Sequence, residues 1–274
     1  MMQYLTLGFS SCPNDTYIFD GLVHQKIACP YQFQTEIHDV EQLNQMAKLG
    51  QLDITKASIH ALFHLSDQYQ LLDSGAALGR GCGPLWVGRG AEVPTGGRVA
   101  IPGEWTTANL LFQLAVEGNF EPCFMGFDQV MDAVNSGEVD SGVIIHESRF
   151  TYQEKGLKSY MDLGDWWESE SGQPIPLGGI LVRRDLDPEL KITISRLIRE
   201  SIEFADEHPG SSKDYIKALA QEIEGTVIQK HIDLYVNPFS KTLGDSGREA
   251  ILQLYQVAQN KGLVHPGDGN TLFV

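Results

Sequence analysis

The residues best suited to chemistry in this chain are His146 and Glu147, which directly follow a run of β-branched residues at 143–145. A run of this kind predicts a short buried strand. Ligands of open α/β sheets bind beyond the carboxyl ends of the strands, so this strand would deliver both side chains to a binding edge. Because imidazole titrates near neutral pH, His146 is our candidate for a general base.

A lone histidine is more often structural than catalytic, so the surrounding sequence decides the interpretation. His146 stands between a predicted buried strand and the polar residues Glu147 and Ser148. No Ser-His-Asp set can be assembled around it, and no cluster with metal-ligand spacing occurs in the sequence. The residues alone therefore leave two classes open, an enzyme with one general base and a small-molecule binding protein. They also leave Glu147 open, as a partner that orients the imidazole or as a surface acid.

Other predicted element ends carry polar side chains that could bind a ligand. Thr106 and Thr107 open a helix, where hydroxyl groups satisfy free N–H groups and the helix dipole favours an anion. Lys56 and Ser58 end a short strand, although a lysine in such a place is more often an ordinary surface residue. The turn at residues 10–16 also has the composition of a helix start, which by itself indicates no more than a capped helix.

Two histidines and one arginine are weaker candidates. His60 and His64 lie four residues apart on a predicted helix, the spacing of a metal pair, but no third ligand is near them and we interpret them as packing histidines. Arg80 is the one cation in the glycine-rich stretch at 74–84 and is a weak candidate for binding a carboxylate. That stretch lacks the Gly-Lys-Ser/Thr of a phosphate loop, so its glycines predict a close backbone approach or a flexible connection.

The elements that position these residues repeat along the chain. In both residues 48–58 and residues 135–148, a helix ends at a glycine, an aspartate follows, and a strand then runs to a polar edge. Each copy is preceded by a strand that feeds a helix start. We therefore predict two α/β lobes whose strand ends face one cleft, formed by residues 1–94 with 180–274 and by residues 95–179.

The remainder of the chain completes the first lobe. Residues 177–182 predict a strand that returns to it, and the helical pattern then continues at residues 190–207, 213–221, 226–236 and 247–261. The apolar tail at 271–274 is expected to dock on the same lobe. Large aromatic side chains at 163–168 could line an apolar pocket or could simply pack.

Composition narrows the classes of partner. The 274 residues carry a formal net charge of -16, from 36 acidic and 20 basic residues, which disfavours nucleic acid and anionic membrane surfaces. The four cysteines form no CxxC pair, which argues against a zinc or redox motif and fits a reducing compartment. The first residues lack the basic and apolar regions of a signal peptide, and no apolar run is long enough to cross a membrane. We expect a cytoplasmic protein with a small-molecule ligand; its oligomeric state stays open.

Three motifs, at residues 8–16, 75–85 and 144–152, carry a resemblance to a known family. They read Gly-Phe-Ser-Ser-Cys-Pro-Asn-Asp-Thr, Gly-Ala-Ala-Leu-Gly-Arg-Gly with Gly-Pro-Leu, and Ile-Ile-His-Glu-Ser-Arg-Phe-Thr-Tyr. The chain resembles the 1,4-dihydroxy-6-naphthoate synthases of the futalosine route to menaquinone, nearly from end to end. The resemblance implies a two-lobed fold like the type II periplasmic binding proteins, with an interlobe cleft. It also implies a lyase that splits cyclic dehypoxanthine futalosine into 1,4-dihydroxy-6-naphthoate and dihydroxyacetone, without a metal or organic cofactor.

The resemblance also assigns residues. The family's proton acceptor falls on His146, and its substrate contacts fall on Lys56, Ala57 and Ser58 in the first lobe and on Thr107 and Ala108, next to Thr106, in the second. From this assignment we expect a retro-aldol type of C–C cleavage with His146 as the general base. Chorismate dehydratase, a sister family in the same pathway, is the closest alternative, and a cytoplasmic small-molecule binding module is the alternative from another class.

Overall fold

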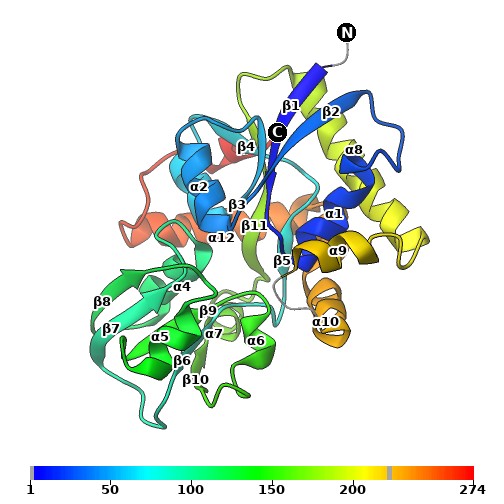
Figure 1. Cartoon of the computed structure of the whole chain (residues 1–274). Coiled ribbons are helices and arrows are strands. Elements are labelled where there is room, and N and C mark those ends of the chain that lie inside the picture. Colours follow the sequence, from blue (N-terminus) through cyan, green and yellow to red (C-terminus); the bar gives the residue numbers. More distant parts are fainter. Residues whose placement is uncertain (1–2, 221–223) are drawn as a thin grey trace.

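Two β-sheets organise the chain, one above the other in Figure 1. The computed structural model describes residues 3–220 and 224–274. The first sheet has the strand order β2-β1-β3-β11-β4, with β5 beside β11. Its strands are β1 (Gln3–Phe9), β2 (Tyr31–Ile37), β3 (Ile54–Ser58), β4 (Tyr69–Leu71), β5 (Ala77–Gly79) and β11 (Ile175–Arg183). The second sheet has the order β10-β6-β9-β7-β8 and consists of β6 (Leu85–Gly88), β7 (Gly96–Ile101), β8 (Asn119–Phe124), β9 (Ser141–Ile144) and β10 (Lys158–Asp162).

Each sheet is built on the same parallel unit of strand, helix, strand, helix and strand. In the first lobe β1 pairs in parallel with β2 and β3, and in the second lobe β7 pairs in parallel with β8 and β9. The connecting helices are α1 (Pro13–Val23), α2 (Val40–Lys48), α4 (Thr107–Ala115) and α5 (Val130–Ser136). The predicted repeat between the lobes is therefore confirmed, and so is the two-lobed α/β architecture.

The aspartate shared by the two copies has the same structural task in each. Asp53 Oδ2 accepts a hydrogen bond of 2.9 Å from the backbone N–H of Thr6 in β1. Asp140 Oδ2 accepts one of 2.8 Å from the backbone N–H of Arg98 in β7. In each lobe the aspartate lies just before the third strand, and its carboxylate holds that part of the chain against the first strand. The strand ends that carry Lys56 and His146 are thereby held at matching places in the two lobes.

Most of the remaining helices cover the first lobe, while α6 (Ser148–Thr151) and α7 (Leu163–Ser171) lie along the second. The others are α3 (Ile59–Leu65), α8 (Pro188–Glu207), α9 (Lys213–Leu219), α10 (Gly225–Tyr235), α11 (Pro238–Lys241), α12 (Gly244–Asn260) and the short 3-10 helix η1 (Gly269–Leu272). Helices α8, α9 and α10 all pack against α1 (Figure 1). The helices predicted after residue 190 are confirmed, while the end predicted at residue 221 lies outside the described residues. Across the described chain, no helix is both long and apolar enough to pass through a bilayer.

The chain's tail docks on the first lobe, as predicted. The side chain of Gln70 donates a 2.7 Å hydrogen bond to the carbonyl of Phe273, and the N–H of Val274 donates one of 3.1 Å to the carbonyl of Leu71. A parallel bridge between Leu71 and Phe273 extends the edge of the sheet beside β4. The tail therefore lies on the same lobe as β1, the first strand of the chain (Figure 1).

The two crossings between the sheets occur earlier in the chain than the predicted boundaries. Strand β6 ends before residue 94, yet it pairs antiparallel with β9 and belongs to the second sheet. Strand β11 begins at Ile175, two residues before the predicted return strand and five before the predicted lobe boundary at residue 180, and it pairs antiparallel with β3. The predicted boundary between residues 94 and 95 instead falls between β6 and β7, which belong to the same sheet. The sequence hides this because β6 has only four residues and its partners, β9 and β10, lie more than fifty residues further on.

The glycine-rich stretch before β6 lets two backbones come together. A Cβ atom placed on Gly83 would lie 2.3 Å from the Cα of Gly164 at the start of α7, so only glycine allows this approach. Of the two readings predicted for the stretch, the close approach is confirmed. Arg80 lies at the surface and forms an ion pair with Glu168 at 3.3 Å, away from the interlobe pocket. Trp167 is fully buried in the core, so its role is packing.

Candidate active site

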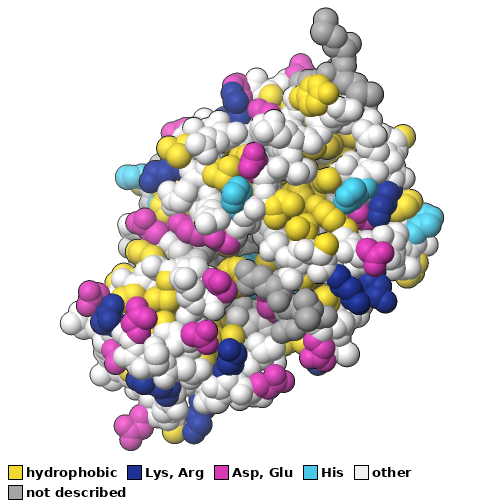
Figure 2. Space-filling view, in the orientation of Figure 1, with side chains coloured by type: hydrophobic (Ala, Val, Ile, Leu, Met, Phe, Trp, Pro, Cys, Tyr) yellow, Lys and Arg dark blue, Asp and Glu magenta, His cyan; other side chains and the backbone are white. Residues whose placement is uncertain are grey.

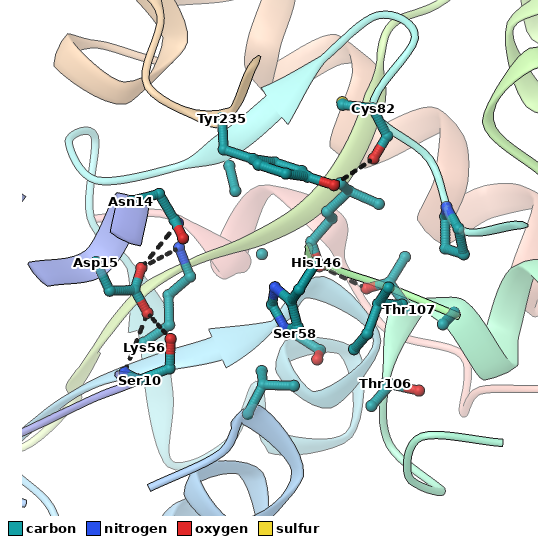
Figure 3. Close-up of a pocket in the computed structure, with 17 residues that line it drawn as sticks. Ser10, Asn14, Asp15, Lys56, Ser58, Cys82, Thr106, Thr107, His146 and Tyr235 are labelled. Atoms are coloured by element: carbon teal, nitrogen blue, oxygen red, sulfur yellow. Dashed lines mark hydrogen bonds and ion pairs between the residues drawn. The ribbon is translucent and has the colours of Figure 1, made fainter. Parts of the chain in front are cut away.

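A pocket lies at the junction of the two lobes, and both lobes contribute to its wall (Figure 3). The first lobe supplies side chains that follow β1 or end β3, namely Ser10, Asn14, Asp15, Lys56 and Ser58. The second lobe supplies the start of α4 and the residues after β9, namely Thr106, Thr107, Ala108, Ile145 and His146. The strand ends thus meet at one site, where ligands of α/β sheets bind.

Six of the seven predicted site residues line this pocket, and Ala57 does not. The side chain of Ala57 is fully buried in the hydrophobic core. Successive side chains of a strand point to opposite faces, so Lys56 and Ser58 face the pocket while Ala57 faces away. The backbone of Ala57 is also occupied, because it pairs with Gly179 of β11. Ala57 therefore shapes the wall from behind.

His146 directly follows β9 and has a left-handed backbone, with φ of 56°. This region is uncommon for residues other than glycine, costs on the order of 1–3 kcal/mol, and is enriched at functional sites. The imidazole packs edge-on against Phe127, with ring centroids 5.1 Å apart. Its Nε2 is buried and makes no hydrogen bond with any described residue. The backbone strain thus aims an unsatisfied nitrogen into the junction.

The environment keeps His146 neutral. Burial lowers the pKa of its imidazole to about 4, and the nearby ammonium of Lys56 also lowers it, while the Asp15 carboxylate raises it. At neutral pH the ring is therefore uncharged and can accept a proton. His146 also lines a second hollow, here called the outer hollow, which shares Ser10 and Val40 with the pocket as well. The ring consequently borders the space between the lobes and is not sealed in the interior.

The outer hollow is acidic, whereas the inner pocket holds one cationic side chain. Four carboxylates line the hollow, from Asp39, Glu41, Glu104 and Asp128. Figure 2 shows a row of acidic side chains at the junction of the two lobes on this face. Among the described residues of the inner pocket, Lys56 is the one lysine or arginine. Asp15 also lines the inner pocket and pairs with Lys56, so these two groups carry no net charge together. The inner pocket is therefore less unfavourable for an anionic ligand group than the hollow.

Lys56 is held by a buried carboxylate. Its Nζ lies 3.1 Å from Asp15 Oδ1, and the side chains are 7% and 1% exposed. Asp15 also accepts hydrogen bonds from the N–H of Ser10 at 3.1 Å, the hydroxyl of Ser10 at 2.7 Å and the amide of Asn14 at 3.0 Å (Figure 3). Lys56 is therefore no ordinary surface lysine, and Asp15, predicted only as a helix-start residue, fixes its place.

The hydroxyls of the two threonines are already engaged within the protein. Thr106 caps α4 by accepting a 3.2 Å hydrogen bond from the N–H of Asn109. Thr107 donates one of 2.7 Å to the carbonyl of Leu177 in β11 and accepts one of 3.2 Å from the N–H of His60. Thr107 thus ties the second lobe to the first. What α4 offers a ligand is the free N–H groups of its first turn and its positive dipole end.

No pattern in the sequence indicated that His231 would lie near the site. This residue of α10 has 0% exposure, and its ring lies nearly parallel to that of His146, with centroids 6.1 Å apart. Its Nε2 is 3.0 Å from Asn14 Oδ1, and its Nδ1 is 3.8 Å from Glu147 Oε2. Glu147 is only 9% exposed, so it is no surface acid. Tyr235, one turn after His231, lines the pocket as well.

Donor atoms of Cys12, His146 and Glu147 lie within 4.8 Å of one another, the one such group of three among the described residues. Burial is the main reason why the pKa of the Cys12 thiol lies well above its usual value. The thiol is therefore neutral, and a neutral thiol is a poor metal ligand. We do not assign these residues as metal ligands.

His60 and His64 face each other, with Nε2 atoms 3.1 Å apart, and His60 Nδ1 lies 3.1 Å from the carbonyl of Thr106. Their predicted packing role is consistent with these contacts.

Comparisons with known proteins agree on the class of this chain. A family model described as menaquinone biosynthesis matches residues 5–260. A 1,4-dihydroxy-6-naphthoate synthase from Thermus thermophilus is 46% identical over 97% of this chain and 97% of its own length. A second, from Streptomyces coelicolor, is 42% identical over 95% of this chain and 94% of its own. The chain belongs to the 1,4-dihydroxy-6-naphthoate synthase family of menaquinone biosynthesis.

Solved structures confirm the fold of this family member. Protein AF1704 from Archaeoglobus fulgidus superimposes with a TM-score of 0.91 at 36% identity, covering 95% of this chain and 98% of that one. The periplasmic aliphatic sulphonate binding protein of Escherichia coli superimposes with a TM-score of 0.69 at 11% identity, covering 100% and 92%. The second likeness concerns the fold alone. The predicted periplasmic-binding-protein-like architecture is therefore confirmed.

Proposed function

We propose that this protein is a carbon–carbon lyase that converts cyclic dehypoxanthine futalosine into 1,4-dihydroxy-6-naphthoate and dihydroxyacetone. The names of the full-length relatives support this reaction. The single structural observation that carries it is the neutral, strained His146, which faces an interlobe pocket with one cation. A purely binding protein has no need of a buried imidazole with a free nitrogen at that place.

His146 starts the proposed reaction as a general base. Its Nε2 accepts the proton of a hydroxyl group on the sugar-derived part of the substrate. One C–C bond breaks, the hydroxyl carbon becomes the carbonyl of dihydroxyacetone, and the electron pair of the bond moves into the ring system. The imidazolium of His146 then returns its proton to the product, so the base is regenerated and no atom is gained or lost. That ring system becomes aromatic, which supplies driving force, so we propose that the reaction needs no metal or organic cofactor.

The proposed binding mode follows from charge. The aromatic carboxylate of the substrate would lie in the inner pocket, near the ammonium of Lys56 and the start of α4 at residues 106–108. Ser58 offers a hydroxyl beside it, and Ala57 contributes only by shaping the wall. The sugar-derived part would then lie toward the polar outer hollow. His146 borders both spaces, which places the base where the two parts of the substrate separate.

Incubation with cyclic dehypoxanthine futalosine tests the proposal, with the absorbance of the naphthoate product as the readout. We expect turnover by the wild type and a loss of about 10²–10⁴ in rate for His146→Ala. Chorismate, offered in parallel, tests the sister reaction and is expected to remain unchanged. A binding module would raise its melting temperature with the ligand and release no product, and that result would refute the lyase. We also propose that the protein works in the cytoplasm, a reducing compartment that suits its four free cysteines.

A further inference from the structure

His231 belongs to no part of the proposed reaction, yet it is fully buried beside the inner pocket. It lies in α10, and its Nε2 is 3.0 Å from Oδ1 of Asn14, which lines the pocket. The exposed fractions of the two side chains are 0% and 4%. Polar groups buried to this degree are costly unless they are hydrogen-bonded. The bond to Asn14 is the first link of a chain that reaches the cation of the pocket.

The contacts of Asn14 determine how its amide is oriented. Asp15 is paired with Lys56 and, as a carboxylate, can only accept, so the amide nitrogen of Asn14 faces Asp15 Oδ1 at 3.0 Å. The amide oxygen then faces His231, whose Nε2 must carry a proton in order to donate to it. Burial lowers the pKa of His231 well below its usual value, so the ring is neutral and this N–H is its single donor. His231 thus holds the amide of Asn14 in one of its two orientations.

The carboxylate of Asp15 is shared among several donors. Its Oδ2 accepts from the backbone N–H and the hydroxyl of Ser10, at 3.1 and 2.7 Å. Its Oδ1 accepts from the amide of Asn14 at 3.0 Å and lies 3.1 Å from the ammonium of Lys56 (Figure 3). Asn14 and Lys56 therefore compete for the same oxygen atom. The ammonium directs no hydrogen bond to any described residue, which leaves its hydrogens for a ligand in the pocket.

We propose that His231 is a positioning residue for the ammonium of Lys56, on which it acts through Asn14 and Asp15. With its amide fixed, Asn14 keeps part of Asp15 Oδ1 occupied, and Lys56 is left to contact a carboxylate of the ligand. An ammonium that formed a close hydrogen bond with Asp15 would attract that carboxylate less. This inference deepens the proposed function and rests on it for the identity of the ligand.

Burial is what lets an effect of His231 reach Lys56. The three contacts of the chain measure 3.0, 3.0 and 3.1 Å, and its four side chains are between 0% and 6% exposed. In such an interior each hydrogen bond is strengthened, and the loss of one leaves its partner unsatisfied. Without the donor on His231, the amide of Asn14 is free to turn. Lys56 then takes up the vacated side of Asp15 Oδ1, and a ligand carboxylate loses part of its attraction.

The binding of two probes tests the proposal without turnover. One is 1,4-dihydroxy-6-naphthoate, and the other is 1,4-dihydroxynaphthalene, which has the same ring system without the carboxylate. We expect His231→Leu to weaken the binding of the naphthoate by about 3- to 10-fold and to leave the binding of the diol nearly unchanged. In the lyase assay the same variant should raise KM more than it lowers kcat.

Three further variants separate positioning from a general loss of structure. His231→Gln keeps an N–H donor of similar reach and should restore the affinity for the naphthoate. Asn14→Ala should weaken the naphthoate like His231→Leu, and the double variant should be no weaker than either, because both residues act in one chain. His208→Leu, which changes an exposed histidine, should leave the binding of both probes unchanged.

Four outcomes would overturn the proposal. The first two are an unchanged affinity for the naphthoate in His231→Leu and an equal loss for both probes. The others are losses that add fully in the double variant and a wild type that shows no preference for the naphthoate. If His231→Leu does not fold, the nitrogen shifts of the wild-type ring decide, because a proton on Nδ1 alone contradicts the chain. Turnover is measured separately, so failure of the lyase assay refutes the proposed reaction and leaves the binding curves to decide the role of His231.

Discussion

The ammonium of Lys56 and the carboxylate of Asp15 form an ion pair of 3.1 Å in which both side chains are almost fully buried. Lys56 lies in β3 and Asp15 belongs to the first turn of α1, so the pair joins two elements of the first lobe at the pocket wall. The ammonium makes no well-directed hydrogen bond with any described residue, so its hydrogens are available to a ligand. One pair thus combines a structural and a binding role.

We expect Lys56→Met to destabilise the protein by about 3–5 kcal/mol, because it leaves the Asp15 carboxylate buried without its cation. The same change should weaken substrate binding and raise KM, since the pocket loses its one cationic side chain. Urea unfolding followed by circular dichroism measures the first effect, and steady-state kinetics the second. Lys155→Met, which removes an exposed ion pair with Asp132, should change stability by less than about 1 kcal/mol. Equal losses in both variants would contradict a special role for Lys56.

The rate should depend on pH through an unusually acidic group. Burial lowers the pKa of His146 to about 4, so its basic form is present above that pH and is lost as the pH falls through it. We expect kcat/KM to stay level from neutral pH down to about 5 and then to fall about tenfold per pH unit below 4. Circular dichroism at each pH separates this loss from unfolding. An acidic limb near 6.5 would show that the ring titrates as an ordinary exposed histidine.

The repeat in the sequence predicted most of what positions the site. A glycine stop, an aspartate and a strand recur in both lobes, and the structure gives Asp53 and Asp140 the same bond to the first strand. Local patterns of this kind determine where a parallel strand ends, and parallel strands place their ends together. His146 and Lys56 could therefore be placed at one edge from the sequence alone.

Local patterns did not predict which distant strands pair with each other or which way their side chains face. The sheet of β6 depends on partners far along the chain, and which face of β3 meets the pocket depends on how β3 pairs with β1 and β11. His231 lies on an ordinary amphipathic helix, where a buried histidine has the same pattern as an apolar residue. Its importance comes only from its contact with Asn14, which the tertiary fold creates.

Thr107 should matter for stability as well as for binding. Replacing it by valine leaves the carbonyl of Leu177 and the N–H of His60 without their partner, at a cost of about 1–3 kcal/mol. Thr107→Ser keeps the hydroxyl and should keep nearly all of the stability. Thermal unfolding of the two variants measures the difference. If Thr107→Val unfolds like the wild type and changes only KM, the hydroxyl serves the substrate and not the joint between the lobes.

The contact between Gly83, just before β6, and Gly164, at the start of α7, should tolerate no larger side chain. A methyl group on Gly83 would lie 2.3 Å from the Cα of Gly164 and 2.4 Å from its nitrogen, and both are backbone atoms that cannot turn aside. We expect Gly83→Ala to destabilise the protein by about 1–3 kcal/mol or more, because α7 must move away from the strand it packs on. Gly225→Ala is the matched control, since no atom lies within 4 Å of the added methyl group, and it should change stability by less than about 1 kcal/mol. Urea unfolding compares the two, and equal stability would mean that the close backbone approach contributes nothing to how the second lobe is held.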